Sequence, residues 1–255
     1  MAPTDSRSLS ELFATATDWS QADGEGDWTA VSALHWLGTR EVLNRALEMT
    51  SSRDPRERAR GADILGQLGI PDRTFPDECL NALVKLIDEN SDANVLESAV
   101  FALGHLRDAS GIEALLRLVN NTDGDVRHGV AFALGLSADP RAVAALIRLT
   151  GDSDAHVRDW ATFGLGAGEV NTPEVREALH ERLSDPDEDT QFEAVCGLAR
   201  CRDTRAAPLL SEWLGESPDN SFLLEAARQL LGMDDRDDTV SVDGLISGLR
   251  ALANG

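Results

Sequence analysis

Hydrophobic and small residues recur in a fixed pattern roughly every thirty residues along this chain. The segments Val126 to Gly135 and Val157 to Gly166 share it, with such residues at the first, fifth, eighth and ninth positions of a common motif. At about 100° per residue these positions form one stripe along an α-helix. The last leucine of the motif marks seven copies, at Leu37, Leu65, Leu103, Leu134, Leu165, Leu198 and Leu231.

A second helix with its own apolar spacing lies between successive motifs. One runs through Ile112, Leu115 and Leu118, and another starts after the turn Ala138-Asp139-Pro140, where proline suits a first helical turn. No stretch alternates with the period of a strand over a useful length, so the pattern predicts an all-α fold. We expect an α-solenoid of about seven helix pairs that stack into a curved, right-handed array.

The chain is predicted to be one repeat domain with a cap at each end. The solenoid is expected over residues 27–233, as a single cooperative array. Residues 1–26 are expected to form an N-terminal capping helix, from Leu9 to Trp19, followed by the linker 21–26. Residues 234–255 are expected to form a charged link, 234–238, and a C-terminal capping helix from Val242 to Ala253.

The period, the paired helices and the closing Ala-Leu-Gly resemble HEAT repeats of the short class found in bilin lyases. Four segments, at residues 61–67, 126–133, 157–163 and 193–198, are more specifically similar to bacterial YibA-type HEAT-repeat proteins. Those proteins are encoded beside Rhs-type toxins and are regarded as immunity proteins. The resemblance implies an α-solenoid and a toxin-binding role, and it transfers no site residue to this chain.

Charge narrows the choice of partner. The chain has 23 basic and 45 acidic residues, for a net charge of −22. Such a field repels phosphate backbones, which excludes nucleic acid as the expected partner and favours a basic protein. The alternative is that the acidity only keeps a long array soluble or reflects a saline habitat.

No apolar run approaches a membrane span, and Met1 to Ser10 has no apolar core for a signal peptide. A cytoplasmic protein that does not contact membranes is therefore expected. The three cysteines are expected to be reduced thiols, because their number is odd and their spacing suits no disulfide framework. Only Cys201, just beyond a helix, is a candidate for reactivity.

The third and seventh positions of the motif point away from the apolar stripe, and the fourth lies at its margin. In HEAT arrays the second helix of each pair lines the concave face, so the resemblance places these positions in a groove. Phenylalanine recurs at the seventh position in three consecutive repeats, whereas His35 and Cys196 occupy it elsewhere. The candidate groove consists of Glu97, Phe101, His128, Phe132, Asp159, Trp160, Phe163, Phe192 and Glu193.

An apolar strip flanked by carboxylates suits a partner that carries apolar anchors among lysines or arginines. The alternative is that Phe101, Phe132 and Phe163 pack against each other and only stiffen the array. The arginines at the second position, such as Arg127 and Arg158, are expected to pair with link aspartates such as Asp125, Asp154 and Asp187 in a ladder between repeats.

No catalytic, cofactor-binding or metal-binding residue is predicted. A di-iron site needs several His-Glu pairs, and only His180-Glu181 has that order. No phosphate-binding loop or nucleophile elbow occurs. We therefore predict a non-enzymatic protein-binding scaffold with an acidic, phenylalanine-lined groove, and an immunity protein as its more specific form. The alternative is an enzyme or enzyme subunit related to bilin lyases.

Overall fold

The computed structural model describes residues 5–20, 28–135, 137–233 and 240–254, which are helical with short links and contain no strand. The predicted linker 21–26 and charged link 234–238 lie outside the described residues. The helices are α1 (Leu9–Ala16), α2 (Trp28–Leu37), α3 (Arg40–Thr50), α4 (Pro55–Gly66), α5 (Pro76–Glu89), α6 (Ala93–Leu106), η1 (Ala109–Gly111), α7 (Ile112–Leu116), α8 (Gly124–Leu134), α9 (Pro140–Leu149), α10 (Ala155–Ala167), α11 (Pro173–Arg182), α12 (Glu188–Arg200), η2 (Thr204–Ala206), α13 (Ala207–Glu216), α14 (Ser221–Leu231) and α15 (Val242–Ala253).

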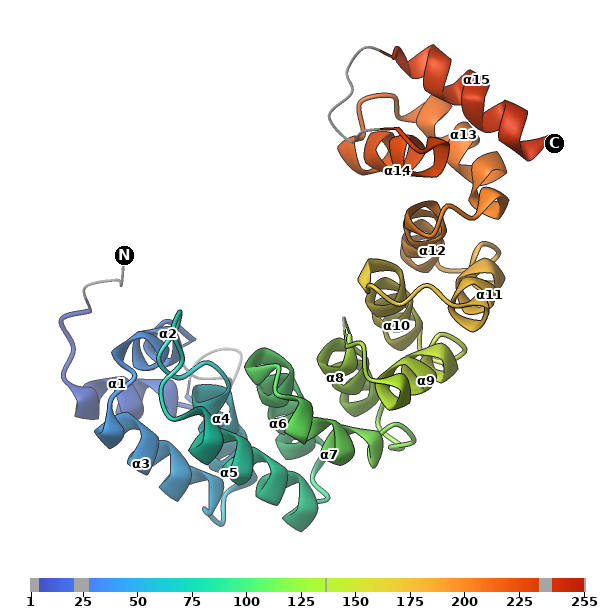
Figure 1. Cartoon of the computed structure of the whole chain (residues 1–255). Helices are drawn as coiled ribbons and strands as arrows, with labels where there is room; N and C mark the ends of the chain where they lie inside the picture. The colour runs from blue at the N-terminus through green and yellow to red at the C-terminus, as the bar shows by residue number, and fades with distance from the viewer. Residues whose placement is uncertain (1–4, 21–27, 136, 234–239, 255) are drawn as a thin grey trace. The chain divides into compact units, whose positions relative to one another are not determined.

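The predicted all-α repeat architecture is confirmed. Each marker leucine falls in the second helix of a pair, and within the described residues seven pairs follow one another from α1–α2 to α13–α14 (Figure 1). Polar residues set the helix starts. Pro140 begins α9, and the Asp139 carboxylate before it accepts a hydrogen bond from the Arg141 backbone N–H. Asp154 and Asp187 cap α10 and α12 in the same way.

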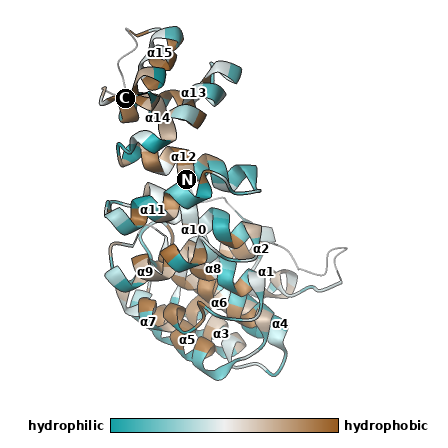
Figure 2. Cartoon of the chain, turned by 90° about the vertical axis from the view of Figure 1, so that its right-hand side faces the viewer, coloured by the Kyte–Doolittle hydropathy of each residue, from teal (hydrophilic) through white to brown (hydrophobic). Residues whose placement is uncertain are grey.

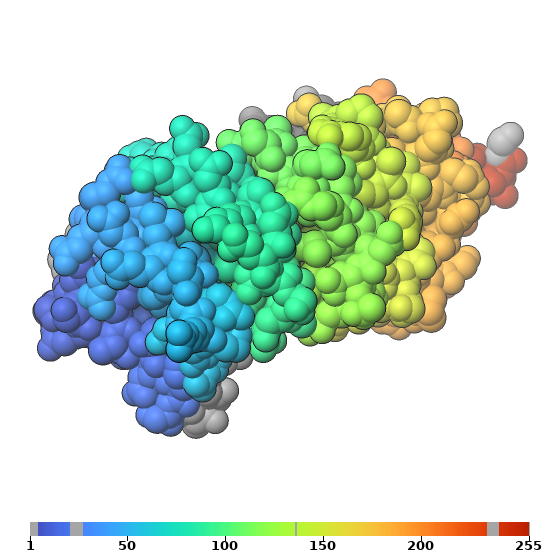
Figure 3. Space-filling view, turned by 90° about the horizontal axis from the view of Figure 1, so that it is seen from below, coloured from blue at the N-terminus to red at the C-terminus, as the bar shows by residue number. Residues whose placement is uncertain are grey.

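Contacts divide the chain into two compact units, Met1–Ala133 (unit 1) and Leu134–Gly255 (unit 2). In unit 1 the second helices α2, α4 and α6 pack on one another, and the first helices α3, α5 and α7 form another layer. Figure 3 shows these first helices side by side in chain order, from blue through cyan to green. Fully buried leucines such as Leu34, Leu65 and Leu83 fill the space between the layers.

Unit 2 repeats this arrangement. The second helices α10, α12 and α14 pack in sequence, and α15 covers α13 and α14. Hydrophobic and hydrophilic residues occupy different sides of the helices (Figure 2), which is the amphipathic pattern that a packed helix needs. Leu245 and Leu249 of α15 are fully buried.

Glycines allow the second helices of unit 2 to approach closely. A Cβ atom at Gly166 would lie 2.8 Å from the Gly197 Cα atom, and one at Gly197 would lie 2.7 Å from the Gly166 Cα atom. Real Cβ atoms do not come this close to backbone atoms. The backbones of α10 and α12 can therefore approach this closely only because both residues are glycines. The glycine that closes the motif is therefore a packing residue.

The N-terminal helix packs against α2. It ends at Ala16, three residues earlier than predicted, and its residues Leu12, Phe13 and Ala16 are buried. Ser8 and Glu11 form a capping box at its start. No described helix is both long and apolar enough to cross a membrane.

The arginines at the second motif position hold the link that precedes their own helix. The Arg158 Nη1 atom donates to the carbonyls of Asp152 and Ser153, at 3.0 and 3.3 Å. Arg127 and Arg58 donate to the equivalent carbonyls of their own links. At the same position of α12, the Gln191 amide donates to the Asp185 carbonyl at 2.6 Å.

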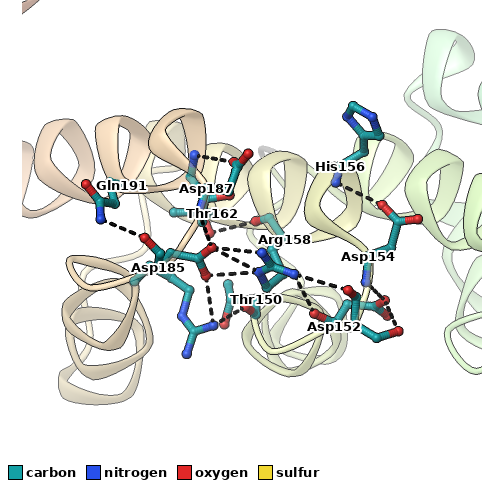
Figure 4. A network of polar contacts seen from close by, with 12 residues as sticks. Thr150, Asp152, Asp154, His156, Arg158, Thr162, Asp185, Asp187 and Gln191 are labelled. Carbon is teal, nitrogen blue, oxygen red and sulfur yellow. Dashed lines mark hydrogen bonds and ion pairs between the residues drawn. The ribbon is translucent and has the colours of Figure 1, made fainter.

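The predicted acidic partner of Arg158 was wrong. Arg158 bonds Asp185 with two nitrogens, at 2.9 and 2.8 Å, and not Asp154 or Asp187 (Figure 4). The carboxylates of Asp154 and Asp187 accept from the first turns of α10 and α12, since a helix start needs a cap. Arg182 also reaches Asp185, at 3.2 Å. A buried carboxylate is thus held by two arginines.

Candidate functional site

Four rings from α6 and α8 form an aromatic cluster in unit 1. The centroids of Phe101 and Phe132 are 5.2 Å apart, and the His128 and His105 rings contact them edge-on at 5.4 and 5.3 Å. Both phenylalanines are half-buried. They therefore pack against each other, as the alternative interpretation holds, and still present part of each ring to solvent.

A cavity of about 490 Å³ in unit 1 opens beside this cluster. Glu97 and Phe101 line it, as do Trp28, Arg60 and Asp63. The Arg60 guanidinium lies 4.3 Å over the Trp28 ring and donates from Nη1 to the Asp63 carboxylate at 3.1 Å. The cavity therefore has aromatic walls and charges of both signs.

The sequence interpretation missed several lining residues of this cavity. Trp28 and Asn94 lie one turn before the third motif position, and Gln67 and His105 lie one turn after the seventh. All of them belong to the helical stripe that the third and seventh positions define. Extending that stripe by one turn at each end would have predicted them.

The candidate residues of unit 2 include two half-buried carboxylates on adjacent helices. Asp159 lies on α10 and Glu193 on α12. Burial, and then repulsion from Asp189 and Asp187, raises the pKa of Asp159 to about 6. Burial, and then repulsion from Asp159, raises the pKa of Glu193 to about 6. Near neutral pH both carboxylates keep a charge that their surroundings disfavour.

Aromatic rings of unit 2 flank these carboxylates in sequence. Trp160 and Phe163 contact edge-on at 5.8 Å, and Phe163 is 36% exposed. Phe192 points elsewhere, because its ring stacks with Trp213 at 6.3 Å and contacts Phe222. Phe192 therefore belongs to a separate cavity that it lines with Trp213.

Replacing Asp159 with Asn is expected to raise the free energy of unfolding by about 1 kcal/mol near neutral pH. The effect is no larger because solvent partly screens the half-buried carboxylate. A raised folded-state pKa means that the charge penalty is complete above about pH 6 and vanishes as pH falls toward the unfolded-state value. Urea unfolding of the variant and the unmodified chain, at about pH 7.5 and about pH 4.5, measures this difference. Glu169→Gln, at an exposed position, controls for net charge. An equal advantage at both pH values would contradict the prediction.

Two residues of the seventh position are closed off from most solvent, although His35 lines the unit 1 cavity. His35 is buried, and its Nε2 atom lies 2.9 Å from the Asp63 carbonyl oxygen, with burial lowering the pKa of the ring to about 4. Cys196 is buried as well, and burial raises the pKa of its thiol to about 12. Burial also raises the pKa of the Cys201 thiol, so the predicted reactivity finds no support in a stabilised thiolate.

Among the described residues, no group of three or more His, Cys, Asp or Glu side chains is placed to hold a metal ion. His180 and Glu181 lie on α11, a first helix, and the His180 ring is half-buried. What the two units offer is a set of half-exposed aromatic rings beside carboxylates. This chemistry suits recognition of a partner surface.

Comparison with known proteins supports the repeat assignment. The pattern of HEAT repeats matches residues 80–166 and 146–232. No curated protein sequence matches the chain significantly. Among solved structures, YibA of E. coli is similar, with a TM-score of 0.76 and 23% identity over 96% of this chain and 93% of YibA.

Two further structures share the fold. The archaeal HEAT-like repeats protein of Thermococcus onnurineus NA1 has a TM-score of 0.51 and 14% identity, over 98% of each chain. The complex of CpcE and CpcF of phycocyanin lyase from Nostoc sp. PCC7120 has a TM-score of 0.50 and 18% identity, over 99% of this chain and 97% of that one. The matched HEAT repeats cover more than half of the chain, and the protein belongs to the HEAT-repeat family.

Proposed function

We propose that this protein is a non-enzymatic scaffold whose second helices bind a basic protein. One observation carries the proposal: Asp159, one helical turn before the exposed Phe163, and Glu193, which Asp159 repels, are both half-buried, and neither forms an ion pair with a described arginine or lysine. A basic side chain placed there would relieve their unfavourable charge, and Phe163 would supply an apolar contact. The net charge of −22 would speed the approach of such a partner.

We infer further that the partner is a toxin domain and that binding neutralises it. This inference rests on the resemblance of four segments to the YibA-type proteins. The structure adds a surface of suitable chemistry in each unit: Glu97, Phe101, His128 and Phe132 in unit 1, and Asp159, Trp160, Phe163 and Glu193 in unit 2.

The test is capture of a partner from the native host by the immobilised chain. Replacing Phe163 with Ser removes a ring that is 36% exposed and meets the Trp160 ring edge-on, so the fold is expected to survive. Leu37→Ser is the matched control, because Leu37 is 48% exposed and lies outside the candidate groove. A basic protein retained by the unmodified chain and the control, and lost by Phe163→Ser, is expected. Equal retention by all three would contradict the proposal.

One observation favours a second candidate, an enzyme subunit of the bilin-lyase kind. The unit 1 cavity of about 490 Å³ falls in the size range of small-molecule sites, and aromatic rings and arginines line it. Titrating the chain with a bilin and recording the absorbance spectrum tests this candidate. An unchanged spectrum would remove it, and a shift that Phe101→Ala abolishes would favour it.

A further inference from the structure

A second cavity, of about 270 Å³, lies in unit 2 where α12, α13 and α14 meet. Its aromatic wall consists of Phe192 and Trp213, whose planes are 18° apart with centroids 6.3 Å apart. Glu188, Asp189 and Glu216 supply the acidic side of the cavity, and all three are exposed. The cavity is smaller than the roughly 300 Å³ at which pockets for organic ligands begin, so it suits a single side chain.

The charge of this cavity is not balanced within the described part of the chain. Elsewhere in unit 2 some arginines pair with carboxylates, as Arg205 does with Asp203 and Glu177. No described arginine or lysine forms an ion pair with Glu188, Asp189 or Glu216. Glu216 also ends α13, where the helix dipole disfavours a negative charge. A cation in the cavity would offset both effects.

The chain itself shows which cation fits an aromatic ring beside a carboxylate. In unit 1, the Arg40 guanidinium lies 3.9 Å over the Phe75 ring and donates to the Glu78 carboxylate at 2.6 and 2.8 Å. Arg60 joins Trp28 and Asp63 in the same way. A planar guanidinium can stack on a ring and donate to a carboxylate at once, which an ammonium group does less well. The unit 2 cavity has the ring and the carboxylates without the arginine.

We propose that this cavity is a binding site for one arginine side chain of a protein partner. The guanidinium stacks on the wall of Phe192 and Trp213 and donates hydrogen bonds to Glu188, Asp189 or Glu216. This proposal depends on the proposed function in one respect, which is that the partner is a basic protein. It lies on residues other than Asp159 and Phe163, so the two can be tested separately.

The test uses the full chain and a short acetylated glycine peptide that carries two arginines. Matched peptides carry lysine or the neutral isostere citrulline in their place. Peptide binding is followed by fluorescence anisotropy and by the indole N–H resonance of Trp213, which Trp213→Phe identifies. We expect the arginine peptide to move that resonance, the lysine peptide to bind more weakly, and the citrulline peptide not to bind.

The triple variant Glu188→Gln, Asp189→Asn, Glu216→Gln is expected to weaken arginine-peptide binding by about tenfold. A triple with the same charge change at exposed positions outside the cavity, Glu41→Gln, Asp77→Asn, Glu169→Gln, is the control and is expected to weaken it by less than about threefold. Glu216→Gln alone provides a milder variant in case the triple unfolds. An equal loss in both triples, an unmoved Trp213 resonance, or equal binding of the lysine peptide would overturn the proposal. Any of these results would leave capture through Phe163 intact, which keeps the two failures distinguishable.

Discussion

Replacing Arg158 with Met is expected to lower the free energy of unfolding by about 3 kcal/mol. The Asp185 side chain is only 1% exposed, and Arg158 supplies three of the hydrogen bonds to its carboxylate. Without Arg158 the buried carboxylate would keep only Arg182 and the Asp187 backbone N–H as partners, and the carbonyls of Asp152 and Ser153 would lose this donor. Urea unfolding followed by circular dichroism measures the loss.

The exposed pair of Arg141 and Asp139 is the matched control for Arg158. Arg141 is 56% exposed, and Arg141→Met is expected to change the free energy of unfolding by less than about 1 kcal/mol. Adding Asp185→Asn to Arg158→Met should recover part of the loss, because it removes the uncompensated charge. Additive effects of the two substitutions would show that the ion pair does not couple α10 to the link between α11 and α12.

The second large effect is expected at the glycine contact between α10 and α12. Gly166→Ala should lower the free energy of unfolding by about 2 kcal/mol, since the new methyl group would lie 2.8 Å from the Gly197 Cα atom and the backbones would have to separate. Thermal and urea unfolding measure this effect.

Gly215→Ala provides the control for a helical glycine with free space around it. Apart from the backbone of its own helix and its chain neighbours, no atom lies within 4 Å of a Cβ atom built at Gly215, so this substitution should stabilise α13 by about 0.5 kcal/mol. A Gly166→Ala variant as stable as the unmodified chain would show that the close approach is not needed for packing.

The repeat architecture was predictable because its signal is local and repeated. The period of the apolar stripe fixed the second helices, and proline and aspartate marked the starts of α9 and α10. The C-terminal helix has the predicted bounds, Val242–Ala253. Helix ends were less accurate, as α1 and the short α7 show, because the last turn depends on capping groups.

The partner of Arg158 was not predictable from spacing alone. Several aspartates lie in each link, and the sequence does not show which one caps the helix and which one remains for the arginine. The Asp187 carboxylate caps α12, whereas the Asp185 carboxylate accepts hydrogen bonds from Arg158. The two aspartates are only two positions apart, and spacing alone does not distinguish the capping residue from the ion-pair residue.

The sequence predicted that the candidate site residues form a helical stripe, but it did not predict which of their rings pack together and which face solvent. Periodicity placed Phe101, Phe132 and Phe163 on one side of their helices. It could not show that Phe101 and Phe132 pack together, that Phe163 stays exposed, or that Phe192 turns toward Trp213. Those differences depend on neighbouring helices, which the motif does not encode.

The central claim is that the second helices bind a basic protein through Phe163 and the carboxylates near it. The most direct measurement is the affinity of the captured protein for the unmodified chain, for Phe163→Ser and for Leu37→Ser, at equal thermal stability. We expect Phe163→Ser to weaken binding by about tenfold or more and Leu37→Ser to change it by less than about twofold. The same affinity for all three chains would contradict the account.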